Sequence, residues 1–150
     1  MRILYGMKIL AKNRRATFDY KIEDTFVTGL VLVGTEVKAA KSGHVQLKGS
    51  YVRVSNEEAW LLNSHISHYP NASEKSQHVP DRTRKLLLTK KQIKDLFAAK
   101  QNGKNIIPLS IGLDHGYLKL EIATATSKKL HDKRQVIKER EARRSVKSLR

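Results

Sequence analysis

Residues 107–122 read IPLSIGLDHGYLKLEI. Every second residue is apolar from position 107 to position 113, and the alternation returns from 118 to 122. A period of two is typical of a β-strand that buries one face and exposes the other. The segment between the two runs, Asp114-His115-Gly116, contains residue types that suit a tight turn. The stretch therefore predicts an antiparallel β-hairpin.

Further strands are predicted upstream of this hairpin. Residues 51–54 and 59–62 flank an Asn-Glu-Glu turn and predict a second hairpin. Residues 18–22 alternate apolar with charged side chains, which favours a half-buried strand. We expect a turn at residues 23–25 and a more apolar strand over residues 26–34.

Two helices are predicted between these strands. Thr89 and Gln92 have the spacing of a capping box ahead of an apolar stripe, and Gly103 is a helix stop. A shorter helix is expected over residues 36–41, with Thr35 as its cap. Six short strands with these helices predict a mainly β fold. The expected architecture is a small antiparallel OB-fold-like β-barrel with short interposed helices and a basic, conditionally helical C-terminal tail.

The charge of the chain points to a polyanionic partner. The chain has 150 residues with 30 Lys or Arg against 14 Asp or Glu, a net charge of +16. We divide it into a flexible leader (1–12), a barrel (13–126) and a basic tail (127–150). The tail carries +7 and the rest of the chain +9. Basic charge on both parts favours nucleic acid, because phosphate contacts release counterions. The alternative is a basic protein with no such partner.

The tail is predicted to be disordered when free and helical when bound. Residues 127–150 have too little apolar surface to offset the entropy of ordering them. Asp132 nevertheless opens a capping-box-like pattern, and Lys133, Arg140 and Arg144 fall on one helical face. We therefore expect this segment to form a helix when a polyanion is present.

The sequence offers no chemistry for an enzyme. It has no cysteine, which excludes disulfides and thiolate metal sites and suits a reducing cytoplasm. No apolar run reaches the length of a membrane span, so we expect a cytoplasmic protein with no membrane partner. His65, His68, His78 and Asp81 match no strong metal-ligand spacing. We expect no catalytic residue, metal or cofactor; an RNA-processing enzyme is the alternative, and it predicts RNA cleavage with divalent metal.

Two short basic segments are candidate RNA contacts. Arg82, Arg84 and Lys85 stand just before an apolar triplet, where they favour a phosphate clamp. A solvated run of charges is the alternative. Asn13-Arg14-Arg15 precedes the first predicted strand, and its side chains suit contacts to phosphates or base edges. An ordinary flexible basic leader is the alternative for this second segment.

Several blocks of the chain match one bacterial family in order and spacing, across nearly the whole length. The blocks are NRR (13–15), DYKIE (19–23), GTEVK (34–38), SYVR (50–53), HIS (65–67), RTRKLLL (82–88), IPL (107–109), LHDKR (130–134) and IKERE (137–141). By these blocks the chain resembles the family of small protein B, the tmRNA-binding (SsrA-binding) proteins of bacteria.

The resemblance implies a non-catalytic RNA-binding adaptor with an OB-like barrel. Such a protein binds the tRNA-like domain of tmRNA and brings it to stalled ribosomes for trans-translation, which means ribosome rescue and nascent-peptide tagging. Elongation factor Tu and alanyl-tRNA synthetase are then indirect partners, through tmRNA. The tail is implied to enter the mRNA channel and decoding region of the small subunit. A generic OB-fold ribosome-associated or single-stranded RNA-binding factor is the alternative, but it has no need of the Asp132-Lys133-Arg134 motif.

The resemblance and the two basic segments together assign candidate residues. The predicted tmRNA-binding set is Asn13, Arg14, Arg15, Arg82, Arg84, Lys85, Leu86 and Leu87. The predicted ribosome-binding set in the tail is Lys128, Lys129, His131, Asp132, Lys133, Arg134, Lys138 and Arg140. His131 matches a position that stacks on a base of the decoding centre.

The chain departs from the family pattern at a few positions. Val27 stands where an acidic residue is usual, and Phe18 stands where His is common. Thr89 replaces a polar amide, and Ser127 replaces the Gly ahead of the paired lysines.

Overall fold

The computed structural model describes residues 7–148, with side chains of the C-terminal helix described for residues 133–146. The strands are β1 (Lys8–Lys12), β2 (Tyr20–Gly29), β3 (Val45–Gln46), β4 (Tyr51–Ser55), β5 (Glu58–Leu62), β6 (His65–Ile66), β7 (Arg84–Leu86), β8 (Asn105–Asp114) and β9 (Tyr117–Ser127). The helices are α1 (Ala16–Asp19), α2 (Gly34–Lys41), the short 3-10 helix η2 (Glu74–Ser76), α3 (Lys90–Gln101) and α4 (Leu130–Ser148).

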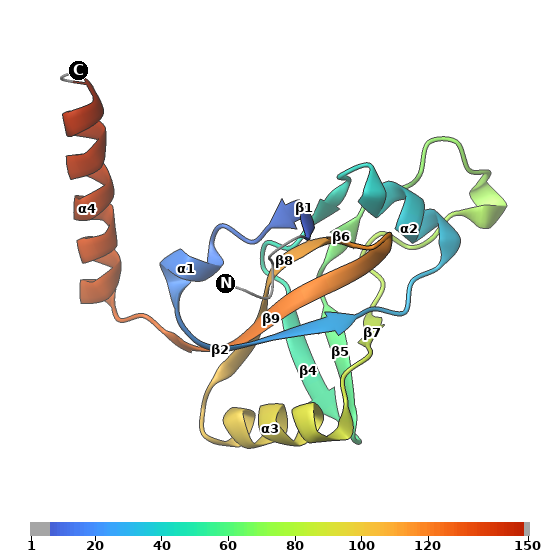
Figure 1. Cartoon of the computed structure of the whole chain (residues 1–150), viewed down its shortest axis with the longest axis horizontal. Helices are drawn as coiled ribbons and strands as arrows, with labels where there is room; N and C mark the ends of the chain where they lie inside the picture. The colour runs from blue at the N-terminus through green and yellow to red at the C-terminus, as the bar shows by residue number, and fades with distance from the viewer. Residues whose placement is uncertain (1–6, 149–150) are drawn as a thin grey trace.

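The mainly β, antiparallel architecture is confirmed, but its strands do not form one closed barrel. Within residues 7–148 they form a four-stranded sheet in the order β1-β8-β9-β2, a three-stranded sheet β4-β5-β7 and a two-stranded sheet β3-β6. Figure 1 shows these sheets gathered around a common centre, with α3 at one end and α4 extending away from the strands. The sheets are joined through side-chain packing and an isolated bridge between Leu30 and Leu86.

The hairpin predicted from residues 107–122 is the centre of the largest sheet. Strands β8 and β9 pair antiparallel, and the turn between them places His115 at φ 50° and Gly116 at φ 83°. Positive φ at both central residues is the turn geometry that matches the twist of a hairpin. The second predicted hairpin, β4 with β5, is also confirmed, and Asn56 and Glu57 turn it at φ 51° and 62°.

A bulge changes the face on which the apolar residues of β8 lie. The β8–β9 register shifts between Pro108 and Ser110, so Leu109 is the extra residue. Before the bulge, Ile107 packs in a small cluster beside α1; after it, Ile111 packs in the main core. The prediction of a single apolar face along residues 107–113 was therefore wrong, because both faces of β8 are covered.

The start of the chain differs from the prediction. Residues 8–12, placed in the flexible leader, form β1 and pair with β8, whereas residues 1–6 lie outside the described residues. Residues 18 and 19, predicted as the start of a strand, belong to α1, and β2 runs through the predicted turn at 23–25. Only a register shift between Ile22 and Thr25 marks that turn. Here strand pairing with β9 outweighs the local preference of Glu-Asp-Thr for a turn.

The helix after Thr89 is confirmed together with its cap. The Thr89 hydroxyl accepts a hydrogen bond from the backbone N–H of Gln92, and the Gln92 side chain accepts from the N–H of Thr89. Leu96 is buried, but Phe97, expected in the apolar stripe, is half-exposed. The shorter helix α2 begins at Gly34, and Thr35 does not cap it: its hydroxyl bonds to the His78 ring instead.

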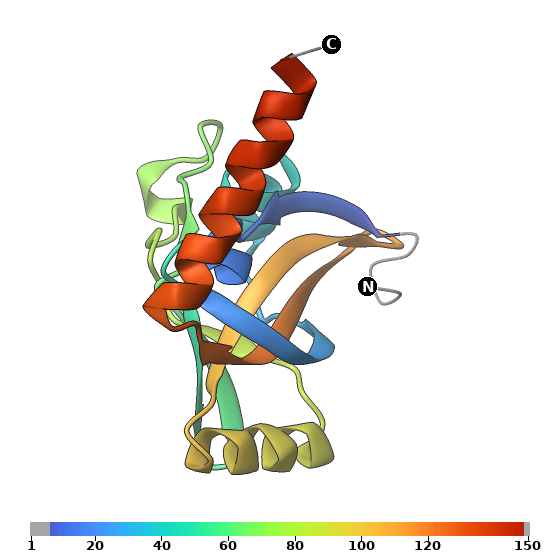
Figure 2. The same cartoon turned by 90° about the vertical axis from the view of Figure 1, so that its left-hand side faces the viewer.

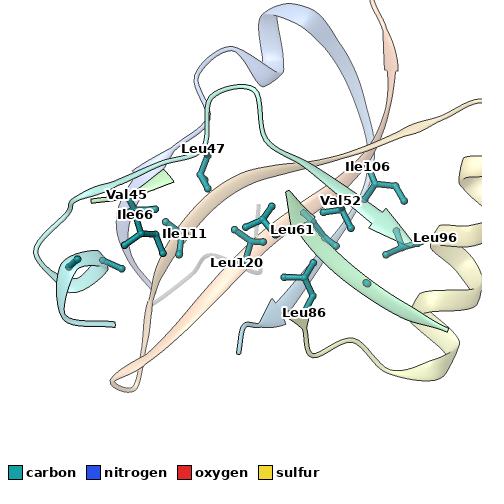
Figure 3. Close-up of a cluster of buried hydrophobic side chains, with 14 residues drawn as sticks. Val45, Leu47, Val52, Leu61, Ile66, Leu86, Leu96, Ile106, Ile111 and Leu120 are labelled. Carbon is teal, nitrogen blue, oxygen red and sulfur yellow. The ribbon is translucent and has the colours of Figure 1, made fainter. Parts of the chain in front are cut away.

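The main core lies between the sheets and is purely aliphatic in its buried part. Figure 3 shows Leu120 of the large sheet beside Leu61 and Leu86 of the three-stranded sheet, and Ile111 beside Ile66 of the two-stranded sheet, with Leu96 of α3 at one end. Each such side chain contributes about 1.5–3 kcal/mol by leaving water. Within the described residues, no helix is both long and apolar enough to span a membrane.

Candidate nucleic-acid interface

Helix α1 contacts Lys128, just before α4, and the first turn of α4 through hydrogen bonds and an ion pair. The backbone N–H of Lys128 donates to the Asp19 carbonyl at 2.9 Å, and its ammonium donates to the Thr17 carbonyl at 2.7 Å. The Lys133 ammonium lies 3.6 Å from the Asp19 carboxylate. Figure 2 shows α4 rising from this junction as a long straight helix. The direction of the tail is thus set by a four-residue helix of the body.

The Phe18 ring adds a second set of contacts at the same junction. Arg15 of α1 lies 4.9 Å from the ring centroid, and Arg140 and Lys133 of α4 lie 5.7 and 6.0 Å from it. Cations at these distances are attracted to the electron-rich face of the ring. The Phe18 ring is therefore a point at which the tail contacts the body.

Between α1, α4 and the large sheet lies an open cleft of about 720 Å³, which we call the α1–α4 cleft. Its rim is basic: Lys12, Arg14, Arg15, Arg140 and Arg144 all line it. The structure therefore brings together the predicted Asn13-Arg14-Arg15 segment and Arg140 of the predicted tail set, although more than 120 positions separate them in the chain. Such a rim provides the field that attracts a polyanion.

The floor of the cleft is polar and buried. Ser110 and Glu121 stand directly opposite each other on β8 and β9, and they are only 2% and 4% exposed. Asn13 lies beside them, with its side-chain N–H group bonded to the Pro108 carbonyl at 2.9 Å. Burial raises the pKa of the Glu121 carboxyl above its ordinary value.

The other predicted basic segment has a different role. The Arg84 side chain is fully buried, its Nε lies 2.6 Å from Glu36 Oε2, and its remaining donors reach Ser64 and the Pro80 carbonyl. Arg82 bonds both oxygens of the Glu36 carboxylate, at 2.5 and 3.2 Å. We call Glu36, Arg82 and Arg84 the Glu36 ion-pair cluster. It ties α2 to β7 from inside the fold.

The prediction that Arg84 clamps an RNA phosphate was therefore wrong, and so was the direct contact predicted for Leu86. Arg84 has no exposed surface, and Leu86 is a core residue. Burial alone would raise the pKa of Glu36, but hydrogen bonds from Arg82, the Val33 N–H and Arg84 outweigh it and hold the pKa below its ordinary value. Glu36 is thus ionised inside the fold, and its two oxygens pair with the guanidinium groups of Arg82 and Arg84.

The alternate residues of the same segment face outward. Leu87 is 59% exposed, and its N–H donates to the Gly29 carbonyl at 2.9 Å. Lys85 is partly exposed and lies 3.2 Å from the Glu58 carboxylate. Val31 is also exposed, and its N–H donates to the Lys85 carbonyl. Period-two alternation applied to residues 84–87 would have separated the inward pair from this outward pair.

The predicted tail residues lie on or just before α4. Lys128 and Lys133 contact α1 as described, and Arg140 contacts Phe18. Lys129, Arg134 and Lys138 are exposed. The backbone of His131 and Asp132 is helical, but their side chains lie outside the described ones; the helix begins at Leu130, two residues before the predicted start.

The histidines of the polar segment are engaged within the protein. His78 is buried, and its Nε2–H donates to the Ile66 carbonyl at 2.8 Å; in the neutral ring Nδ1 then accepts from the Thr35 hydroxyl at 2.8 Å. His65 Nδ1 lies 2.8 Å from Asp81. Among the described residues, no group of three or more His, Asp or Glu side chains is placed to hold a metal ion.

Sequence reasoning missed Ser110 and Glu121. It treated both as solvent-facing members of alternating strands. One signal in the sequence was available. Glu121 stands between the apolar residues Leu120 and Ile122, and small residues follow, a pattern that indicates a strand covered on both faces.

The model of the family described as SmpB protein matches residues 10–150. The chain belongs to the SmpB family. An SsrA-binding protein of Coprothermobacter proteolyticus is 48% identical over 142 residues, covering 93% of this chain and 95% of that protein. One from Trichodesmium erythraeum is 44% identical over 142 residues, covering 94% and 91%.

A solved structure shares the fold of this SmpB-family chain. It is described as "tmRNA-SmpB: a journey to the center of the bacterial ribosome", and it superposes with a TM-score of 0.67 at 36% identity. The match covers 83% of this chain and 86% of the other. The family resemblance stated from the sequence blocks is thereby confirmed.

Proposed function

We propose that this chain is an RNA-binding adaptor of trans-translation, which binds the tRNA-like domain of tmRNA and brings it to stalled ribosomes for rescue and nascent-peptide tagging. The observation that carries the proposal is the match of the family model to residues 10–150, body and tail together. The relatives are SsrA-binding proteins at nearly full length, and the structural neighbour is a tmRNA–SmpB assembly on the ribosome.

The body and the tail have separate tasks in this proposal. The body, residues 13–126, holds tmRNA, and the outward residues Lys85 and Leu87 are its candidate contacts beside the Asn13-Arg14-Arg15 segment. The tail carries the ribosome contacts, with Lys129, Arg134 and Lys138 exposed along α4. Its basic helix suits the mRNA channel and the decoding region, because both are walled by RNA phosphates.

Arg84 and Leu86 act indirectly in this proposal. They fix β7 from inside, so that the side chains of Lys85 and Leu87 point outward. Elongation factor Tu and alanyl-tRNA synthetase are indirect partners, reached through tmRNA. The protein itself has an adaptor role without catalysis, in the bacterial cytoplasm.

Recovery of RNA with the full chain from its native cell tests the proposal. We expect one dominant RNA, tmRNA, enriched over bulk tRNA and messenger RNA when the chain is purified in moderate salt. A profile that follows the abundance of cellular RNAs would instead support a generic RNA-binding factor and contradict the proposal.

Removal of residues 131–150 tests the division of tasks. We expect tmRNA affinity to change by less than about threefold, because the body keeps its contacts, while peptide tagging on stalled ribosomes is lost. Gel-shift titration and a tagging assay measure the two. Equal loss of both activities would refute the separation of body from tail.

A further inference from the structure

The floor of the α1–α4 cleft holds polar atoms that the protein leaves without a partner. Among the residues that the structure describes, the buried side-chain atoms with no hydrogen-bond partner are Asn13 Oδ1, Ser110 Oγ and Glu121 Oε2. All three residues line this one cleft. Buried polar atoms are almost always paired, so three orphans in one place indicate a ligand that pairs them.

The backbone places these atoms together. Ser110 and Glu121 are direct cross-strand partners, which puts their Cβ atoms about 5 Å apart on the same face. The bulge at Leu109 turns Ser110 toward this face, while Ile111 keeps its place in the main core. The Asn13 amide N–H is already bonded to the Pro108 carbonyl, which leaves its oxygen free to accept.

These atoms require donors from the ligand. Asn13 Oδ1 and an ionised Glu121 Oε2 are acceptors only, and Ser110 Oγ both donates and accepts. A bare metal ion would be repelled by the five cations of the rim. A planar group with adjacent N–H donors can bond the acceptor atoms of the floor, and a phosphate joined to it can pair with the cations of the rim.

We propose that the α1–α4 cleft receives one unpaired nucleotide of RNA, with the donor edge of its base on Asn13, Ser110 and Glu121 and its phosphate on the basic rim. Guanine is the base that fits, because its Watson–Crick edge alone presents two neighbouring donors, N1–H and the N2 amino group. Phe18, which also lines the cleft, offers an aromatic surface beside the base. The proposal rests on the proposed function only in taking RNA as the partner.

Four short oligonucleotides that differ at one central base test the proposal on the full chain. The probes are hexauridylate and its variants with a central guanosine, inosine or adenosine. We expect the guanosine probe to bind roughly tenfold more tightly than hexauridylate. Inosine lacks only the N2 amino group, so its affinity should fall between the two. Equal affinities for the guanosine and uridine probes would overturn the proposal.

A matched pair of variants assigns the preference to the cleft. Glu121→Gln should reduce the guanosine preference to less than about threefold, while Glu74→Gln, which removes the same charge from an exposed site on η2, should leave it intact. The thermal midpoint of Glu121→Gln should equal or exceed that of the parent, because an unpaired buried carboxylate is removed, so a lost preference is not unfolding.

Two results distinguish failure of the inference from failure of the proposed function. A guanosine preference that persists in Glu121→Gln would contradict the inference alone, since tmRNA recovery from cells does not depend on this cleft by itself. The co-purified RNA should still be tmRNA when the inference fails. Loss of tmRNA recovery with an intact guanosine preference would contradict the proposed function and leave the cleft as a nucleotide site.

Discussion

Two arginine-rich regions of this molecule look alike in the sequence and differ in the fold. In the Glu36 ion-pair cluster, one buried carboxylate is shared by both guanidinium groups and pairs with each of them. In the α1–α4 cleft, the cations stand at the rim while the buried carboxylate of Glu121 keeps one oxygen without a partner. A run of cations in the sequence therefore indicates a binding site only where the fold does not already pair those cations with buried carboxylates. The first region holds the protein together, and the second is open to a ligand.

The largest expected effect comes from breaking the Glu36 cluster. Glu36→Ala leaves the Arg84 guanidinium buried without its carboxylate, and removing one partner of a buried pair costs about 3–5 kcal/mol. Urea unfolding at neutral pH measures the loss. The control is Glu58→Ala, which removes the exposed partner of Lys85 and should cost at most about 1 kcal/mol. Similar losses in both variants would show that burial does not increase the contribution of this ion pair to the free energy of unfolding.

Acid should weaken the Glu36 ion-pair cluster, because protonation of Glu36 removes the charge that pairs with Arg82 and Arg84. The pKa of Glu36 lies below its ordinary value of 4.5, so its contribution to stability is complete above pH 4.5 and is lost as the pH falls through the folded-state pKa. The pH dependence of the Glu121 contribution runs the other way. Because its pKa is raised in the folded state, protonation of Glu121 stabilises the folded state relative to the unfolded state. Urea midpoints measured at successive pH values should fall less below pH 4.5 in Glu36→Gln than in the parent. Parallel curves for the two proteins would rule out this assignment.

Much of the fold was predictable because its signals are local. The two hairpins and the Thr89 helix follow from alternation, turn residues and a capping box, and all three are confirmed. The parts that failed depend on distant partners. Residues 8–12 become a strand because β8 offers them an edge, and the strand over 26–34 stops at Gly29.

The candidate site, too, was predictable in part from local signals, and the rest depends on distant partners. The basic character of residues 13–15 and of the tail was evident from composition. Their meeting in one cleft depends on α1, which was not predicted and whose last two residues were assigned to a strand. Arg84 was misassigned because a charge in the sequence carries no sign of its burial. Glu36, its partner, lies 48 positions away. Only the fold shows that the two charges cancel.

The smallest expected effect concerns the attachment of α4. Phe18→Ala removes a ring that three cations approach, and we expect the base of α4 to open more readily by about 1 kcal/mol, or roughly fivefold in amide exchange. Hydrogen exchange over residues 133–136 reports this change. Phe97→Ala on α3, also half-exposed, should leave those amides unaffected. Unchanged exchange in Phe18→Ala would mean that the backbone contacts of Lys128 alone hold the helix.

The salt dependence of RNA binding tests the contrast between the two regions most directly. We compare Arg14→Gln/Arg15→Gln, at the cleft, with Lys48→Gln/Lys75→Gln, which removes two exposed charges elsewhere. If the cleft cations meet phosphates, the first pair should lower the slope of log affinity against log salt by about 0.7–0.9 per residue, and the second should leave it unchanged. Equal slopes in the two double variants would contradict the assignment of the α1–α4 cleft as the RNA-facing side of the body.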